Sequence, residues 1–433
     1  MSAFRTTTGL TSWGRVDRPR QDVATPRWAD ELAGLVGGER LLAVGLGRSY
    51  GDSGLNPDGR VVAMRGLDRV HGFDAATGVV RADAGLSLDD LIRLALPHGW
   101  FPAVVPGTKY VTLGGAIAND IHGKNHHREG TFGRHVRRLC LLRTDGSVRE
   151  LAPGDPLFAA TVGGLGLTGV IAWAEIQLSP VSGAWMASED IAFNRLSEFF
   201  DLAEASEAGF DYTVSWIDCT TRNGRGIFSR ANPDGSPDRT PHDPPKIALP
   251  LDFPSFALNP LTLKAFNTFR FAAKSAMAGK KTVHYETFQF PLDAIGQWNR
   301  LYGPKGFYQY QCAIPSAAAR DATAELMSQI ARSGQGSFLA VLKTFGDVPS
   351  PGLLSFPIKG ATLALDFQNG GDATLRLLER LDRVVLEAGG RLYPAKDGRI
   401  SAAMFRASYP NLEEFMKHRD PGLTSAFWRR VAA

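Results

Sequence analysis

The stretch that decides the fold is residues 104–136, which read VVPGTKYVTLGGAIANDIHGKNHHREGTFGRHV and hold six glycines, four histidines and two lysines. Glycine has no Cβ and tolerates positive φ, so the backbone at residues 106–108 and 113–116 can come close to a flat or phosphorylated ligand. The polar run that follows, residues 119–127, is too poor in apolar periodicity to be an ordinary core helix. The stretch therefore indicates a binding site.

Two other kinds of site and a structural turn compete with this interpretation. Gly123-Lys124 resembles the end of a phosphate loop, but that motif needs a glycine where Ala118 stands and Ser or Thr where Asn125 stands. The four histidines lack an HExxH or paired-cysteine spacing, and neighbouring histidines cannot easily face one ion, so we expect no metal. A glycine-rich turn with solvated histidines stays open, because histidine is often only a satisfied polar group.

A second segment, residues 40–54, favours a nucleotide cofactor. Residues 40–44 read as a strand that ends in a loop whose successive N–H groups can form an anion-binding nest for a pyrophosphate. The loop is not the dinucleotide fingerprint, since its glycines read GxGxxxG, no amphipathic helix follows, and the acidic candidate Asp68 follows Gly66 in a turn. The loop consists of Gly45, Leu46, Gly47, Arg48, Ser49, Tyr50, Gly51, Asp52, Ser53 and Gly54.

Together the two segments resemble the flavin-binding half of the vanillyl-alcohol oxidase type of FAD oxidoreductases. Further matches lie along almost the whole chain: TVGGLGLTGVI (161–171), WNRLYGPKGFYQYQ (298–311), FLAVLKTFG (338–346), LSFP (354–357) and GRLYPAKDGR (390–399). The glycine-rich loops alone indicate only the superfamily. DIHGKNHH together with YQYQ and LYPAKD is similar to the decaprenylphosphoryl-ribose oxidase family.

The resemblance implies a bound FAD. By resemblance, the cofactor residues outside the loop are Gly107, Thr112, Leu113, Gly114, Gly115, His122, Gly123, Lys124, Asn125, Ile171 and Tyr393. Relatives with a tethered flavin present a histidine or cysteine to the ring, commonly a histidine in the pyrophosphate loop. Residues 45–54 contain neither residue type, so the FAD is expected to be non-covalent.

The resemblance also implies a substrate, polyprenylphosphoryl-β-D-ribose, whose sugar lies over the isoalloxazine. The residues expected around the sugar are His122, Lys124, Gln309, Gln311, Lys343 and Lys396. The reaction moves hydride from the 2′-carbon to flavin while a base takes the hydroxyl proton. Lysine is a poor base unless it is desolvated or lies beside another cation. Lys396 or His122 is expected to be this base, although Lys396 can instead act only electrostatically. Lys124 or Lys343 is expected to bind the phosphate.

The implied activity is oxidation of the 2′-hydroxyl to the 2′-keto intermediate, the first half of an epimerisation that yields the arabinose donor for cell-wall arabinan. The implied partners are an NAD(P)H-dependent keto-reductase subunit and a quinone or other electron acceptor. One alternative is an FAD oxidase of a soluble alditol, sugar or lactone, which shares the cofactor loops but binds no prenyl chain. Another is a module that binds a nucleotide without redox chemistry.

The expected fold is α+β, in two domains: a vanillyl-alcohol oxidase-type FAD-binding domain at residues 1–184 and an antiparallel-sheet substrate domain at 185–390, with 391–433 returning to the first. The pattern predicts helices at residues 25–36, capped by Thr25, and from Ser87 to about 97. It further predicts a hairpin around Asp145-Gly146, a strand at 170–178, strands at 212–219, 282–290 and 306–313, and helices at 321–332 and 375–388.

Composition agrees with a two-domain enzyme. The chain has 433 residues, of which 44% are hydrophobic and 21% are charged. Its net charge of +4 is too small to indicate a nucleic-acid-binding protein. Cys140, Cys219 and Cys312 have no motif spacing and fit structural thiols rather than a disulfide framework. Neither a signal-peptide core nor a membrane-spanning run is expected. The expected location is cytoplasmic or peripheral at a membrane, with a periplasmic face open by resemblance.

Residues 232–260 carry eight prolines and are expected to form a long mobile loop. Residues 261–281 follow as a basic amphipathic stretch. Such a stretch can contact an anionic lipid surface, although a solvated surface helix is the commoner case.

One strand departs from the family pattern. Mycobacterial ribose oxidases carry a cysteine in an Asn-Ile-Cys-Val-Asp-Phe stretch, where this chain has Thr-Leu-Ala-Leu-Asp-Phe at residues 362–367. Ala364 thus replaces the cysteine, which hydride transfer does not require. Thr362 replaces an amide with a shorter hydroxyl and is expected to loosen sugar specificity.

Overall fold

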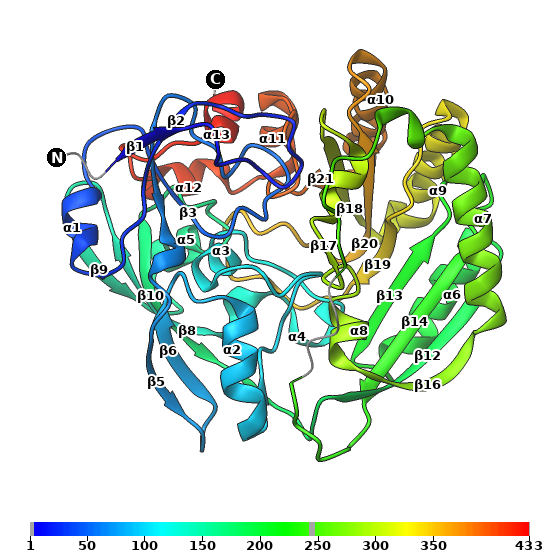
Figure 1. Cartoon of the computed structure of the whole chain (residues 1–433), viewed down its shortest axis with the longest axis horizontal. Coiled ribbons are helices and arrows are strands. Elements are labelled where there is room, and N and C mark those ends of the chain that lie inside the picture. The colour runs from blue at the N-terminus through cyan, green and yellow to red at the C-terminus, as the bar shows by residue number, and fades with distance from the viewer. Residues whose placement is uncertain (1–3, 242–246, 433) are drawn as a thin grey trace.

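The computed structural model describes residues 4–241 and 247–432, and within them three main sheets organise the chain (Figure 1). The smallest of the three has the order β1-β2-β4-β3, with β3 parallel to β4. Its strands are β1 (Arg5–Thr7), β2 (Gln21–Ala24), β3 (Leu41–Val44) and β4 (Arg60–Ala63). The second is antiparallel, with the order β5-β6-β10-β8-β9. Its strands are β5 (Val70–Asp74), β6 (Val79–Asp83), β8 (Val136–Leu142), β9 (Val148–Leu151) and β10 (Val170–Gln177).

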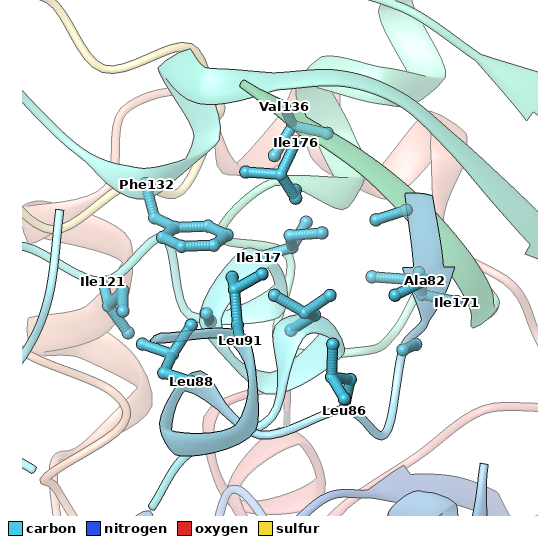
Figure 2. Close-up of a cluster of buried hydrophobic side chains, with 14 of the residues drawn as sticks. Ala82, Leu86, Leu88, Leu91, Ile117, Ile121, Phe132, Val136, Ile171 and Ile176 are labelled. Atoms are coloured by element: carbon cyan, nitrogen blue, oxygen red, sulfur yellow. The ribbon is translucent and has the colours of Figure 1, made fainter. Parts of the chain in front are cut away.

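Short helices pack around these two sheets and position the cofactor loops. They are α1 (Glu31–Leu35), α2 (Leu88–Ala95), α3 (Leu113–Ala118), α4 (His126–Glu129) and α5 (Pro156–Thr161). The predicted cap of α2 is confirmed, since Ser87 Oγ accepts a hydrogen bond from the Asp90 N–H at 3.1 Å. Figure 2 shows the buried side chains of Leu88, Leu91 and Ile117 gathered in one cluster with side chains of β6 and β10. This core fixes α2 and α3 against the second sheet.

In the described part of the chain, the third sheet has eight strands, all paired antiparallel in the order β16-β12-β14-β13-β19-β20-β18-β21. They are β12 (Trp185–Phe193), β13 (Tyr212–Ile217), β14 (Gly226–Pro233), β16 (Gly279–His284), β18 (Phe307–Pro315), β19 (Ala340–Phe345), β20 (Gly360–Gln368) and β21 (Arg391–Leu392). Helices α6 (Leu196–Glu207), α9 (Ser316–Ser333) and α10 (Asp372–Glu387) share a hydrophobic core with its strands. The predicted α+β fold with a large antiparallel sheet is confirmed.

The period of two along these strands separates a packed face from a polar face. Tyr310 and Cys312 of β18 lie in the core shared with α9 and α10, whereas Gln309 and Gln311, which alternate with them along the strand, face a cavity. On β19, Leu342 is buried in the same core and Lys343 faces the cavity. The tyrosines of the YQYQ motif therefore belong to the core, and its glutamines belong to the cavity wall.

After β21 the chain returns to the first half of the molecule through α11 (Ala402–Ser408), α12 (Leu412–His418) and α13 (Ala426–Val431). Leu423 forms a parallel bridge with Leu41 of β3. Arg430 of α13 pairs with Asp52, with 2.7 Å between Nη2 and Oδ1, and with Asp397 at 3.1 Å. The domain boundaries at residues 184 and 390 stay a prediction, as β21 itself belongs to the large sheet.

The remaining described elements are connections. They are β7 (Trp100–Phe101), β11 (Ser179–Pro180), β15 (Ile247–Ala248), β17 (Ile295–Gly296), α7 (Pro260–Ala276), α8 (Tyr285–Gln289), η1 (Met64–Gly66), η2 (Leu96–His98), η3 (Phe132–His135), η4 (Ser255–Ala257) and η5 (Trp298–Tyr302). No helix among the described residues is long and apolar enough to cross a bilayer.

The first predicted helix begins too early. The helix of residues 25–36 starts only at Glu31, because the Glu31 carboxylate accepts the N–H groups of Arg27 and Trp28 and holds the preceding segment in a turn. Thr25 is therefore not its cap.

The predicted strand 282–290 is also wrong in its second half. It ends at His284, whose Nδ1 accepts the Glu286 N–H at 3.3 Å and caps α8. By contrast, the predicted hairpin around Asp145-Gly146 and the strand at 170–178 are confirmed by β8, β9 and β10.

The glycines of residues 113–116 form α3 rather than an open turn, with Thr112 as N-cap. Within the predicted loop 232–260, β14 extends to Pro233, and β15 and η4 are ordered elements. Residues 242–246 of that loop lie outside the described residues.

Candidate active site

A cavity of about 1010 Å³ lies where the two cofactor loops meet the polar face of the large sheet. Ligand pockets commonly measure about 300–1,000 Å³, so this one is at the upper end of that range. Its walls include loop 43–50, the stretch 105–124 and residues of β13, β18, β19 and β20. The volume suits a ligand with several parts.

The two glycine-rich segments touch each other at the wall of the cavity. A Cβ on Gly45 would lie 2.2 Å from Thr112 Oγ1, so glycine is required there for the loops to pack. Thr112 Oγ1 in turn accepts the Gly115 N–H at 3.1 Å. Gly47 has φ of 65°, a left-handed conformation that glycine adopts without strain. The backbone of both loops is thereby held at the cavity surface.

These loops fit a flavin nucleotide. Ser53 Oγ lines the cavity, is buried, and has no hydrogen-bond partner within the described residues. A Cβ on Gly107 would meet nothing within 4 Å, so the wall is open at this point. Arg48 adds a cation beside the loop, with its guanidinium carbon 4.0 Å from the Trp13 ring centroid. A buried hydroxyl, free backbone and a cation are the donor set that a pyrophosphate needs.

Most of the predicted cofactor residues line this cavity. They are Gly45, Leu46, Gly47, Arg48, Ser49, Tyr50, Ser53, Gly107, Thr112, Gly114, Gly115, His122, Gly123, Lys124, Ile171 and Tyr393.

Four predicted cofactor residues instead support the wall from behind. A Cβ on Gly51 would lie 1.6 Å from the Asp397 carbonyl oxygen, so glycine lets the loop touch the 393–397 segment. Asp52 pairs with Arg430, and Leu113 is fully buried in the hydrophobic core that also holds Leu88 and Leu91. Asn125 donates its amide to the Ala103 carbonyl at 2.7 Å. None of the four is among the lining residues of the described cavity.

His122 lies at the centre of the site and connects the two halves. Its Nε2 is 3.0 Å from Gln311 Nε2, and the rings of Phe345 and Tyr393 lie 4.9 and 5.3 Å from its own ring centroid. Burial, followed by the charge of Lys343, holds the pKa of His122 well below its ordinary value. The ring is therefore neutral at neutral pH. With the Gln311 amide donating to Nε2, the ring proton sits on Nδ1, which has no partner among the described residues.

Three of the lysines that line this cavity, Lys124, Lys343 and Lys396, lie in the segments that the sequence analysis singled out. Lys124 Nζ donates to the Gln289 carbonyl at 2.7 Å, and Lys343 Nζ donates to the Gly123 carbonyl at 3.0 Å. Burial lowers the pKa of Lys343 to about 8. Burial and the neighbouring Lys343 lower the pKa of Lys124 to about 7. Concentrated positive charge of this kind favours an anionic ligand.

Lys396 is the third lysine, and it has a different environment. Its Nζ lies 3.8 Å from the Tyr50 ring centroid and makes no hydrogen bond or ion pair to the described residues. Burial lowers its pKa to about 7, although the nearby Asp366 raises it in part. A desolvated amine of this pKa is able to accept a proton at neutral pH.

Asp366 is a site residue that the sequence analysis missed. It is fully buried, lines the cavity, and accepts hydrogen bonds from Gln309 Nε2 at 2.7 Å and Tyr302 Oη at 3.1 Å. Burial raises its pKa above the ordinary range. The signal was available, because alternation along residues 362–367 places Thr362, Ala364 and Asp366 on one face. The structure confirms that Ala364 lines the cavity and that Thr362 contacts Gln311, with 3.3 Å between Oγ1 and Nε2.

Lys109 belongs to the glycine- and histidine-rich stretch 104–136, but it has a structural role. Its Nζ lies 2.6 Å from Glu286 and 2.8 Å from Asp89, and the side chain is buried. Cys140, Cys219 and Cys312 are buried free thiols, none of which lines the described cavity. No cluster of potential metal ligands is found among the described residues.

Comparison with known proteins agrees with this geometry. A family model described as an FAD binding domain matches residues 23–152. The decaprenylphosphoryl-β-D-ribose oxidase of Mycolicibacterium smegmatis is 40% identical, over 96% of this chain and 94% of its own length. The chain belongs to the decaprenylphosphoryl-β-D-ribose oxidase family. It is an FAD-dependent oxidoreductase of that type.

Other relatives share only a part of the chain. An alditol oxidase from a Streptomyces species is 27% identical over 40% of this chain and 42% of its own length. Cytokinin dehydrogenase 7 of Oryza sativa subsp. japonica is 33% identical over 40% of this chain and 35% of its own length. Of these three relatives, the ribose oxidase is the one whose match covers nearly the whole chain, and so includes the large sheet that carries Gln309, Gln311 and Lys343.

Proposed function

We propose that this protein oxidises the 2′-hydroxyl of polyprenylphosphoryl-β-D-ribose to the 2′-keto compound. The observation that carries the proposal is the meeting of the cofactor loops with Gln311, Lys343 and Lys396 in one cavity. The relationship to a decaprenylphosphoryl-β-D-ribose oxidase over nearly the whole chain supports it. Such a reaction is the first half of an epimerisation that makes an arabinose donor for cell-envelope arabinan.

When bound, FAD supplies the hydride acceptor. The residues proposed to hold it are the pyrophosphate loop, Gly107, residues 112–115 and Tyr393. We propose that the link is non-covalent, because the described cavity wall contains His122 but no cysteine, and His122 is engaged by Gln311. His126 and His127, the other candidates for a tether, do not line the described cavity. His126 is buried against Phe345, and His127 Nε2 lies 2.8 Å from the Phe210 carbonyl.

Lys124 and Lys343 are proposed to bind the substrate phosphate. Each ammonium is held at the cavity wall by one hydrogen bond to a backbone carbonyl, which leaves two N–H donors for a ligand. A phosphodiester between them would relieve the repulsion that lowers the pKa of Lys124. The ribose would then be anchored at its phosphate end.

Lys396 is proposed to be the base that takes the 2′-hydroxyl proton. Its neutral amine has a free lone pair, whereas the accepting nitrogen of His122 is occupied by Gln311. His122 is proposed to donate from Nδ1 to a sugar oxygen and so to orient the ring. The proton taken by Lys396 would be stabilised by the Tyr50 ring and by Asp366.

The alternative of a soluble alditol, sugar or lactone as substrate has less support. The alditol oxidase relative matches only 40% of this chain. A match of that length leaves more than half of this chain without a counterpart. A nucleotide-binding module without redox chemistry is disfavoured by the family.

The resemblance also suggests partners. An NAD(P)H-dependent keto-reductase is proposed to complete the epimerisation, and a quinone or another acceptor to reoxidise the flavin. The proposed location is the cytoplasm or a membrane face, the periplasmic one included.

Anaerobic reduction of the flavin tests the function. Mixing the oxidised protein with polyprenylphosphoryl ribose should bleach the yellow absorbance, while an equal concentration of an alditol or a lactone should not. Mass analysis of the product should show the loss of two hydrogens. Bleaching by the alditol but not by the phosphoribosyl lipid would overturn the proposal.

A further inference from the structure

Helix α7 presents an apolar stripe to solvent, the reverse of an ordinary surface helix. Leu261, Ala265, Phe269, Ala272 and Ala276 recur at intervals of three and four residues, and all five are exposed. Phe256, in the turn before the helix, is 81% exposed, Leu261 80% and Phe269 73%. We call these six residues the α7 face. Large exposed apolar patches commonly mark a surface that something covers.

The inner side of α7 is attached by polar contacts and by the Phe266 ring, which lies 5.9 Å from the Phe338 ring centroid. Its buried residues are Leu263 and Asn267. Asn267 Nδ2 donates to Asp218 Oδ1 at 3.1 Å and to the Ser337 carbonyl at 3.2 Å. The helix lies along the outer edge of the large sheet (Figure 1), where it contacts β12 and β14. The α7 face therefore points away from the protein core.

The charged side chains within the segment that carries the α7 face have a single sign. Residues 253–281 contain no Asp or Glu but do contain Lys264, Arg270, Lys274, Lys280 and Lys281. The nearest acidic residue before them, Asp252, is paired with Arg15. Lys281 is paired with Asp190, whereas Lys264 and Lys280 are exposed. An apolar stripe flanked by unopposed cations is complementary to an anionic bilayer surface.

The α7 face also adjoins the cavity of the active site. Arg270 and Lys274 of α7 line that cavity, as do Ala248 of β15 and Ile295 of β17. Arg270 lies against Trp216 of β13, with 5.0 Å between the guanidinium carbon and the ring centroid. The cavity thus extends from the cofactor loops to the inner edge of α7. A ligand whose sugar lies at Lys396 has a path toward this helix.

We propose that the α7 face docks on an anionic lipid bilayer and brings the mouth of the cavity to the membrane surface. The prenyl chain of the substrate then stays in the bilayer while its phosphoribosyl head enters the cavity. This proposal rests on the proposed function for the identity of the lipid, although bilayer binding itself does not depend on it. A second copy of the chain could cover the apolar stripe, but pairing two copies of the α7 face would bring cations of the same sign together, which gives no favourable electrostatic energy.

Vesicle flotation of the FAD-loaded protein tests the docking. Vesicles of phosphatidylcholine with phosphatidylglycerol should carry the protein, and vesicles of phosphatidylcholine alone should carry much less. A Phe256→Ser/Leu261→Ser/Phe269→Ser variant should lose about tenfold or more of the binding. A Lys264→Glu/Lys280→Glu variant should lose the preference for anionic vesicles. Substitution of exposed apolar residues on other elements, Val148→Ser and Leu386→Ser, should change neither.

Substrates of two lengths separate docking from catalysis. The triple serine variant should keep its yellow colour and oxidise a short-chain prenylphosphoryl ribose in solution at the wild-type rate. It should lose turnover of a long-chain substrate embedded in vesicles. If the wild type binds anionic vesicles but oxidises neither substrate, the proposed function fails and the docking stands. If the flavin bleaches with substrate but the protein never floats, or if it only dimerises through the α7 face, the docking is wrong.

A site-specific probe reports the orientation without any loss of binding. The native cysteines are buried, so a fluorophore on Phe269→Cys labels the α7 face selectively. Its emission should shift to the blue with anionic vesicles, and the same probe on Leu386→Cys should not respond. Equal shifts at both positions would contradict the proposed orientation.

Discussion

Lys396 places its ammonium 3.8 Å from the ring centroid of Tyr50, so that a lysine from the far end of the chain covers a residue of the pyrophosphate loop. The same two segments are joined at the backbone, where the Tyr50 N–H donates to the Ala395 carbonyl at 2.9 Å. The aromatic ring favours the charged form of Lys396 and burial favours the neutral form. This balance is what a group needs in order to take a proton and later release it.

Replacement of Lys396 tests its role directly. Lys396→Ala should retain FAD, because the backbone contact to Tyr50 does not involve the side chain. It should lose about 100-fold or more of the rate of flavin reduction, the magnitude typical of removing a general base. Stopped-flow bleaching at saturating substrate measures this rate. The exposed Lys359→Ala serves as a control, and near-normal bleaching in Lys396→Ala would remove Lys396 from the mechanism.

The pH dependence of the reaction should follow the lysines. The pKa of Lys396 is lowered to about 7, so its neutral form accumulates as the pH rises through 7, and the limiting rate of flavin reduction should rise with it. Lys124 and Lys343, with pKa values of about 7 and 8, lose their charge over the same range, so the substrate KM should increase above about pH 8. In Lys396→Ala the rise in rate should vanish while the KM trend persists. A rate that falls as pH rises through 7 would contradict the assignment.

Short motifs in the sequence identified residues that the fold brings together at one cavity. GLGRSYGDSG, DIHGKNHH and YPAKD each contribute residues that line one cavity, although they lie up to about 350 residues apart. Their assembly depends on Leu41–Leu423 and Arg430–Asp52, contacts that no local pattern reveals. Alternation along residues 362–367 could have placed Asp366 on the cavity face, but its contact with Gln309 and its burial appear only in the fold.

Boundaries were predicted less well than the site. The Thr-Pro pair at residues 25–26 has the pattern of a helix start, yet the Glu31 carboxylate accepts the N–H groups of Arg27 and Trp28 and holds the preceding segment in a turn, so the helix starts at Glu31. The segment 282–290 alternates like a strand, but the His284 side chain turns it into α8. In both cases a side-chain hydrogen bond outweighed the propensity pattern.

The attachment of FAD can be determined by acid precipitation. The flavin should enter the supernatant, since the described cavity wall holds only His122 as a possible histidine tether and its Nε2 contacts Gln311. Absorbance of the two fractions near the flavin maximum is the measurement. Yellow colour kept in the pellet would show a covalent bond, and peptide mapping should then begin with residues 122–127.

Arg430 should matter for stability as well as for cofactor retention. Its guanidinium compensates the buried Asp52 and also contacts Asp397, so Arg430→Met leaves two carboxylates without their cation. Removing one partner of such a pair destabilises a protein by on the order of 3 kcal/mol. The free energy of unfolding, measured with denaturant, and the affinity for FAD should both fall. The surface variant Arg195→Met should change neither quantity. Unaltered stability in Arg430→Met would show that this contact does not hold the C-terminal segment.

Ala364 should protect the enzyme from thiol-directed electrophiles. It lies on β20 opposite Gln311 and lines the cavity, at the position where the family resemblance leads us to expect a cysteine. Ala364→Cys should become susceptible to nitroaromatic compounds reduced by the flavin, with little change in turnover. Intact-mass analysis after incubation with substrate and electrophile would show one adduct on the variant and none on the wild type. No adduct on a variant that binds the compound would mean that residue 364 does not face the reacting atoms.

The most direct test of the central claim, hydride removal from the 2′-carbon of the ribose, is the isotope effect on flavin reduction. Polyprenylphosphoryl ribose carrying deuterium at the 2′-carbon should reduce the flavin more slowly than the unlabelled compound, with a normal primary effect. Deuterium at the 3′-carbon should leave the rate unchanged. An effect at the 3′-carbon, or none at either position under single-turnover conditions where reduction limits the rate, would contradict the account.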